Sequence, residues 1–213
     1  YAHLDNIAHS RRGAAFECVV TPGIRAVEKR DRPAIFITAH LGNWELAALA
    51  VAEQRIPVTA VYSPLPNPGL DHRLAGYRRV LGCHLVPREE SMRPLLAEVK
   101  AGRSIGLLVD QKVENGEPLP FFGRDKMTTL IPARLALRHG LELVPIRIRR
   151  LGGARFRATL CEPVRADDDE AGEMDQARQM MIKVNPQAPA QQVVVKIPVL
   201  GTYSDTWPLD CPK

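Results

Sequence analysis

The chain has 213 residues, of which 45% are hydrophobic and 25% are charged, so disordered and fibrous classes of protein are excluded. The formal net charge of +5 favours acidic partners, whether nucleic acid, anionic lipid headgroups or an acidic carrier protein, without choosing among them. No apolar stretch approaches the roughly 20 residues that cross a bilayer, so no transmembrane helix is expected.

The first clear element is a strand at residues 34–38, AIFIT, which are apolar and partly β-branched and follow Pro33. The following run, LGNWELAALAVAEQ, is rich in strong helix formers, and Asn43 is a suitable N-cap. A buried helix is therefore expected to begin near Asn43. His40 would then lie in the turn between the strand and the helix.

Strands and helices continue to alternate along the chain. In order, the pattern predicts a strand at 58–62, a helix at 70–81, a strand at 84–86, a helix at 91–101, a strand at 104–109, a long loop at 110–126, a helix from about 128 to 139, strands at 141–148 and 156–160, and a helix within 165–184. Gly140 suits the C-cap of the helix before it. The last two strands are expected to form an antiparallel hairpin. This alternation predicts an α/β fold, a single domain with a mixed, largely parallel central sheet flanked by helices.

The segment AHLGNWE, residues 39–45, holds the candidate catalytic residues. Ligands of open α/β sheets bind at the carboxyl ends of strands, where a neutral imidazole can take a proton from an attacking hydroxyl. Glu45 is the nearest carboxylate that can fix the tautomer of His40. Because positions five apart do not face each other in a continuous helix, the pair needs a turn, for which Gly42 supplies backbone freedom. On this spacing alone, a structural histidine and a first-turn acid are the favoured interpretation.

The run HLGNWE resembles the H-x-x-x-x-[DE] motif of glycerolipid acyltransferases, in the H-x-G-N-W-E form typical of bacterial lipid A lauroyl and myristoyl acyltransferases and related mannoside acyltransferases. The resemblance spans roughly residues 25–165. It continues through Tyr62-x-Pro64, Asn67-Pro68, Asp71, Arg78 with Gly82, Asp110-Gln111, the PFFG of residues 120–123, Thr128 or Thr129, and Val144-Pro145. The agreement in order and spacing makes the signal strong, although each element alone is weak. It implies a glycerolipid acyltransferase-like fold.

Under this resemblance, His40 activates a lipid hydroxyl, Glu45 orients His40, and the hydroxyl attacks an acyl thioester directly, with no cofactor or metal. The thioester oxyanion would be stabilised by backbone N–H groups of the Gly42-Asn43 turn or by an arginine. Candidate arginines are Arg73, Arg78 and Arg79. Arg78 is preferred because it is placed like an arginine of the family. A solvated helix face is an equal alternative for these basic residues.

Asp110 and the pair Phe121 and Phe122 carry open alternatives. Asp110 lies at another strand end, where lining the crevice and an ordinary turn role carry equal weight. The resemblance adds its neighbour Gln111 as a substrate-binding residue. Phe121 and Phe122 would form an acyl-chain wall, although aromatic pairs are more often plain core, and only the family match brings the two interpretations level.

The resemblance also implies the partners and the location of the protein. The donor would be acyl carrier protein or acyl-CoA, and the acceptor a membrane lipid, first a lipid A precursor, with phosphatidylinositol mannosides or lysophospholipids as alternatives. The four cysteines indicate reduced thiols. We expect peripheral binding to the membrane surface on the cytoplasmic face of the bacterial inner membrane. Nucleic acid is not expected as a partner because its recognition motifs are absent. A catalytically inactive lipid-binding relative is the alternative.

The domain organisation departs from the family at both ends. Residues 1–184 are expected to form the acyltransferase domain, without the N-terminal membrane anchor that relatives usually carry. Residues 185–213 are expected to form a divergent tail, with VVVKIPVL as one possible strand. Ser63 stands where many relatives have the arginine of Tyr-Arg-Pro, so any phosphate contact of that arginine is expected to be missing.

Overall fold

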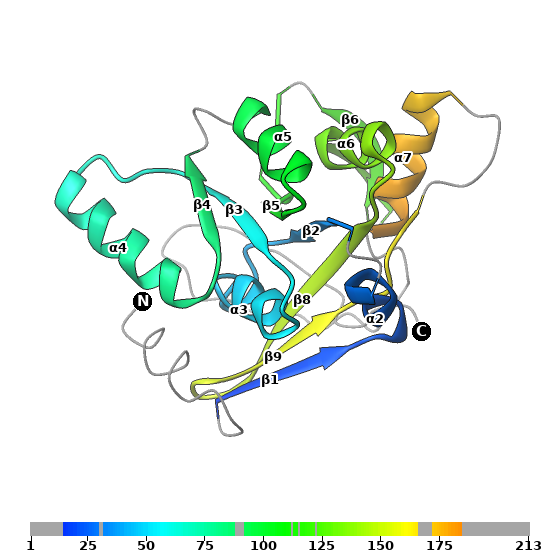
Figure 1. Ribbon diagram of the computed structural model, residues 1–213. Helices are drawn as coiled ribbons and strands as arrows, with labels where there is room; N and C mark the ends of the chain where they lie inside the picture. The colour runs from blue at the N-terminus through cyan, green and yellow to red at the C-terminus, as the bar shows by residue number, and fades with distance from the viewer. Residues whose placement is uncertain are drawn as a thin grey trace.

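The computed structural model describes residues 15–29, 32–87, 92–111, 113–114, 116–121, 123–165 and 172–184 (Figure 1). Helices and strands alternate along most of this part of the chain. In chain order they are β1 (Phe16–Val20), α2 (Pro22–Lys29), β2 (Ile35–Thr38), α3 (Leu46–Glu53), β3 (Val58–Tyr62), α4 (Pro68–Val80), β4 (His84–Pro87), α5 (Met92–Lys100), β5 (Ser104–Leu108), β6 (Glu117–Phe121), β7 (Arg124–Thr128), α6 (Ile131–His139), β8 (Leu143–Gly152), β9 (Arg155–Leu160) and α7 (Glu173–Val184).

Seven strands form one mixed sheet in the order β1-β9-β8-β2-β5-β3-β4. Neighbouring strands are parallel throughout, except for the antiparallel pair β8 and β9. The strands β6 and β7 form a separate antiparallel hairpin. These features confirm the predicted α/β fold with a largely parallel central sheet and a hairpin formed by its last two strands.

Helices cover both faces of the sheet, and each face has its own apolar core. In Figure 1, α2 and α3 lie on one side, and α5, α6 and α7 lie on the other. Phe36 belongs to the core under α3, whereas its neighbour Ile35 belongs to the core under α5, α6 and α7. Successive side chains of a strand point to opposite faces, so a strand buried on both faces reads as a continuous apolar run. This is why AIFIT shows no alternation of polar and apolar residues.

Local signals mark one end of each of two helices. The side chain of Asn67 caps α4 by accepting hydrogen bonds from the backbone N–H groups of Gly69 and Leu70. Gly140 ends α6 in the left-handed conformation, with φ of 60°, and so confirms the predicted C-cap. Over the part of the chain described, no helix has the length and apolarity to cross a membrane.

Three predictions about elements were wrong or incomplete. The expected loop at 110–126 contains β6 and most of β7, and β6 was obscured by Pro118 and Pro120. Both prolines are exposed and occupy alternate positions, which a two-stranded hairpin tolerates because it has two free edges. The last helix begins only at Glu173, and β1 and α2 were not predicted. The predicted tail, with VVVKIPVL, lies outside the described residues.

Candidate active site

The register of two central strands brings the first pair of site residues together. The strands β2 and β5 are parallel neighbours, and Thr38 lies opposite Leu108. Residues two positions beyond each of these, His40 and Asp110, therefore leave the sheet side by side. This edge holds the carboxyl ends of the strands, where ligands of open α/β sheets bind.

The His40–Asp110 pair is well defined. The two oxygens of the Asp110 carboxylate have separate partners: Oδ1 lies 2.8 Å from the ring nitrogen Nδ1 of His40, and Oδ2 accepts a hydrogen bond of 2.8 Å from the His40 backbone N–H. The backbone bond fixes the Asp110 carboxylate, the carboxylate orients the imidazole through Nδ1, and Nε2 becomes the nitrogen available to a substrate. The His40 side chain is 37% exposed, so a substrate can reach it.

Glu45 has a different partner from the one expected. Its carboxylate accepts hydrogen bonds from Arg78, with 2.8 Å from Nη2 to Oε1 and 3.1 Å from Nε to Oε2, and both side chains are buried. The predicted pairing of His40 with Glu45 is therefore corrected to His40 with Asp110 and Glu45 with Arg78. The helix α3 begins at Leu46, after Glu45 and not at Asn43, so the intervening turn carries Glu45 away from His40 toward α4.

Gly42 makes this turn possible. Its φ is +59°, and a Cβ at this position would lie 3.0 Å from the backbone oxygen of Ile148. The predicted need for backbone freedom at Gly42 is confirmed. Asn43 follows in the same turn and is half-buried.

Trp44 connects the His40–Asp110 pair with the Glu45–Arg78 pair. Its ring meets the His40 ring edge-on with 5.5 Å between centroids, and the Arg78 guanidinium lies 5.5 Å from the Trp44 ring centroid. The same guanidinium lies 5.7 Å from the ring centroid of Tyr62. These distances suit cation–π contacts. Neither aromatic residue was predicted as a site residue. The position of Trp44 within the HLGNWE motif was the sequence signal that could have identified it.

An apolar pocket extends from this group between the sheet and α3. It is partly open to solvent. The polar side chains on its wall are Thr38, Glu45 and Arg78. The remaining lining is apolar and comes from β2, β3, β4, β5, β8, α3 and α4, and includes Phe36, Trp44, Ala47, Val51, Val58, Ala60, Tyr62, Leu81, Cys83, Leu85, Gly106, Leu108 and Ile146. Pockets of this composition suit a hydrocarbon chain with a few polar anchors at one end.

Cys83 lies on the pocket wall but is unsuited to act as a nucleophile. Burial, with a smaller contribution from the Glu45 carboxylate, raises the pKa of its thiol to about 11. The thiol is therefore protonated at neutral pH, and the thiolate is the reactive form. In the described part of the chain, no three side chains of His, Cys, Asp or Glu gather to hold a metal ion.

Comparison with known proteins decides the family. Residues 1–192 match the sequence model of the bacterial lipid A biosynthesis acyltransferases. The chain belongs to this family. It is 28% identical over 148 residues to a phosphatidylinositol mannoside acyltransferase of Mycolicibacterium smegmatis, covering 67% of this chain and 49% of that protein. It is 26% identical over 125 residues to lipid A biosynthesis acyltransferase 2 of Shigella flexneri, covering 58% of this chain and 40% of that protein. The chain thus spans half or less of the length of these curated relatives.

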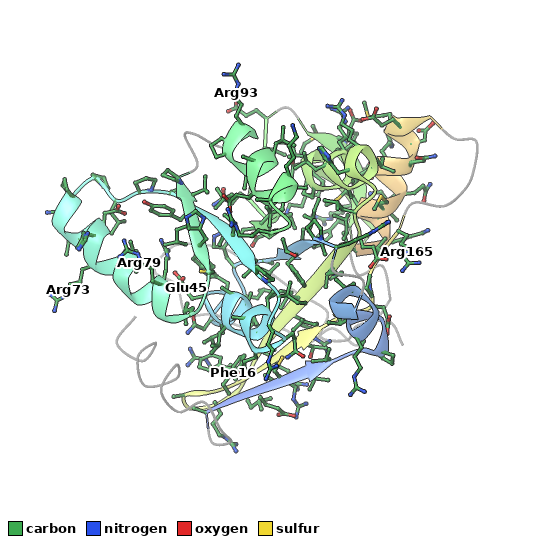
Figure 2. The ribbon with its side chains drawn as sticks, viewed as in Figure 1. Phe16, Glu45, Arg73, Arg79, Arg93 and Arg165 are labelled. Atoms are coloured by element: carbon green, nitrogen blue, oxygen red, sulfur yellow. The ribbon has the colours of Figure 1, made fainter. Side chains whose placement is uncertain are left out.

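The other residues predicted for this acyltransferase family member are more scattered. Arg73 and Arg79 are exposed on α4, and Arg73 points away from the sheet, whereas Glu45 lies between α4 and α3 (Figure 2). Only Arg78 of the three candidate arginines reaches the pocket. Gln111 directly follows Asp110 and is exposed.

Phe121, one of the two residues of the predicted acyl-chain wall, does not line this pocket. Phe121 ends β6, outside the pocket lining, with Lys126 Nζ 5.4 Å from its ring centroid. Lys126 Nζ also donates to the backbone oxygen of Asp110 at 3.2 Å, so the β6–β7 hairpin adjoins the His40–Asp110 pair. Phe122 lies outside the described residues. The apolar wall of the pocket instead comes from the sheet and α3.

Proposed function

We propose that this chain transfers a fatty acyl group from an acyl thioester to a hydroxyl group of a membrane lipid. The observation that carries the proposal is the His40–Asp110 pair, held at a 2.8 Å separation at the carboxyl edge of the sheet next to an apolar pocket. The names of the two relatives, a lipid A and a phosphatidylinositol mannoside acyltransferase, support the same reaction class.

In the proposed reaction, His40 acts as the general base and Asp110 stabilises the imidazolium that forms. The acceptor hydroxyl oxygen attacks the thioester carbonyl carbon while His40 Nε2 takes the hydroxyl proton. The tetrahedral intermediate then breaks its C–S bond, and the leaving thiolate takes the proton back from His40. The new oxygen–carbon bond makes an ester, and no covalent enzyme intermediate is needed. A positioned base of this kind contributes roughly a hundredfold to ten-thousandfold in rate.

The pocket is the proposed seat of the acyl chain. A chain that lies along the apolar wall with its thioester near Thr38 and Trp44 places the carbonyl carbon beside His40. Backbone N–H groups of the turn at Gly42 and Asn43 are the proposed hydrogen-bond donors to the carbonyl oxygen. The positive end of the α3 dipole would also favour the negative charge on that oxygen. The Glu45–Arg78 pair then has a positioning role, because it holds Trp44 against His40 at the pocket mouth.

The donor, the acceptor and the location follow from the resemblance and remain part of the proposal. Acyl carrier protein and acyl-CoA are the proposed donors, and a lipid A precursor is the first acceptor to test. A phosphatidylinositol mannoside is the second, because a relative is named for it. The net charge of +5 supports peripheral contact with an anionic membrane surface, which we place on the cytoplasmic face of the inner membrane.

The test is transfer of a labelled acyl group from acyl carrier protein or CoA to these lipids in detergent micelles. His40→Ala and Asp110→Asn are each expected to lower kcat by about a hundredfold to ten-thousandfold, because the base or its orientation is lost. His84→Ala is the matched control. His84 Nδ1 also faces a carboxylate, Glu98, at 3.3 Å, but neither residue lines the pocket.

Two outcomes would overturn the assignment. If Glu45→Gln abolished transfer while Asp110→Asn left it intact, the partner of His40 in catalysis would be Glu45. If the folded wild type bound acyl chains but transferred none, the chain would be a lipid-binding relative and not a transferase.

A further inference from the structure

A glycine lies in the middle of the pocket floor. Gly106 occupies the third position of the five-residue strand β5, between Phe36 of β2 and Ala60 of β3. All three line the pocket. Glycine in the interior of a strand gives up side-chain packing and costs conformational entropy, so its presence there indicates a close approach by another group.

The backbone does not require glycine at this position. Gly106 is not among the glycines with positive φ in the described residues, so its conformation is open to other amino acids. A Cβ at Gly106 would find its nearest neighbours at 3.8 Å from Val58 Cγ2 and 3.9 Å from the Thr59 oxygen. These are ordinary contacts, and therefore a clash does not explain the missing side chain. The space that a larger side chain would fill is the pocket itself.

The position of Gly106 along the pocket matters. Because the strands run parallel, Tyr62 marks the end of the pocket near His40 and Val58 the far end, a span of about 13 Å along β3 at 3.3 Å per residue. Gly106 lies opposite Ala60, midway along this span. The small side chains Ala47 and Ala48 of α3 also line the pocket. A chain threading from His40 to Val58 must pass over Gly106.

We propose that Gly106 is the residue that admits long acyl chains, and that side-chain size at this position sets the length of acyl group this protein accepts. The inference rests on the proposed function of the pocket. A side chain at position 106 closes the inner half of the pocket and leaves the outer half, next to His40, unchanged. Each methylene group that the side chain excludes from the pocket weakens binding of the acyl chain roughly fourfold, because the free energy of burying that group away from water is lost.

The experiment compares hexanoyl and palmitoyl thioesters with the wild type, Gly106→Ala and Gly106→Leu. The ratio of palmitoyl to hexanoyl kcat/KM is expected to fall a few fold for Gly106→Ala and on the order of a hundredfold for Gly106→Leu. Hexanoyl transfer should change little, because that chain ends before it passes Gly106. Gly76→Leu is the matched control: Gly76 lies in α4, and a Cβ there would meet nothing within 4 Å.

A binding measurement separates this inference from the proposed reaction. Displacement of a fluorescent fatty-acid probe by hexanoate and palmitate reports the same length preference without transfer. If the wild type transferred nothing but the binding ratio shifted as described, the transferase proposal would fail and the role of Gly106 would stand. That role would be overturned if folded Gly106→Leu kept the wild-type ratio of affinities for the long and the short acid. It would also be overturned if the wild type bound neither acid. If Gly106→Leu failed to fold, Gly106→Ala would decide, because its Cβ fits at 3.8 Å.

Discussion

Glu45 and Arg78 form a buried ion pair whose two halves depend on each other. Their side chains are 7% and 8% exposed, so neither charge has access to bulk water. Removing one partner of such a pair leaves the other charge buried without compensation, which costs about 3–5 kcal/mol. We therefore expect Glu45→Gln to lower the free energy of unfolding by about that amount.

Urea denaturation of single and double variants measures this dependence. Glu45→Gln combined with Arg78→Met is expected to recover much of the loss, because both charges are gone and the methionine is apolar. Glu173→Gln serves as the control, since its partner Arg138 is 66% exposed and exposed pairs contribute little. Additive effects of the two pocket substitutions would contradict the coupling.

Residue identities at the site could be predicted only in part. His40 was found because a strand end and a motif coincide there, and Asp110 because it follows a second strand. The predicted pairing of His40 with Glu45 was wrong because local spacing favours the nearest carboxylate. The observed partner, Asp110, lies 70 residues away in the sequence and is brought to His40 by strand register. Trp44 and Tyr62 join the site through ring contacts that no spacing rule encodes.

At the level of elements, Glu98 links α5 to the strands β3 and β4 in addition to the apolar packing of that helix. Glu98 accepts a hydrogen bond of 2.6 Å from the Thr59 hydroxyl of β3, pairs with Arg103, and faces His84 of β4. The hydrogen bond from Arg103 is the main reason that the pKa of Glu98 falls from 4.5 to about 2, against the opposing effect of burial. Because the folded state binds this proton less tightly than the unfolded state, ionised Glu98 stabilises the fold.

The pH dependence of stability follows from this shift. The contribution of Glu98 is fully present above the ordinary carboxyl pKa of 4.5 and is lost as the pH falls toward 2. We expect the loss to be on the order of 2 kcal/mol, reduced from the full shift because Arg103 is partly exposed. Thermal unfolding of wild type and Glu98→Gln between these pH values measures it. The two curves should converge at low pH, and parallel curves would contradict the assignment.

Elements were predictable where their apolar pattern was strong. The strand β2 is a nearly continuous apolar run, β3 and β5 are mostly apolar, and β8 begins with the apolar run LVPI. The caps of α4 and α6 have specific side-chain and backbone signals. The hairpin β6–β7 escaped prediction because its sequences are polar or rich in proline, and its strands are stabilised by pairing with each other. The order of strands in the sheet is a property of tertiary packing and is absent from any local pattern.

For the molecule as a whole, the pocket is continuous with one of the two apolar cores. Phe36, Val58, Leu81 and Cys83 line the pocket and also belong to the core between the sheet and α3. A bound hydrocarbon chain would extend that core and would bind only the folded state. Ligand at about a hundred times its Kd stabilises a protein by about 2.7 kcal/mol, which for a domain of this size raises Tm by roughly 5–10 °C.

Thermal unfolding with saturating palmitate tests this expectation. Butanoate, which has the same carboxylate and little hydrocarbon, should leave Tm unchanged and so serves as the control ligand. A Tm that palmitate does not raise, or that both acids raise equally, would show that the pocket is not the hydrocarbon site.

The placement of β5 also has a consequence for folding. The chain makes β2, α3, β3, α4, β4 and α5 before β5, yet β5 lies between β2 and β3 in the finished sheet. Contacts between segments so far apart in sequence form slowly, because loop closure must precede them. Until β5 is inserted, His40 has no carboxylate partner, and the apolar surfaces of β2 and β3 lack their shared neighbour. The nascent chain is thus prone to aggregate before it is competent to act, and recovery of activity during refolding should follow insertion of β5 rather than formation of the helices.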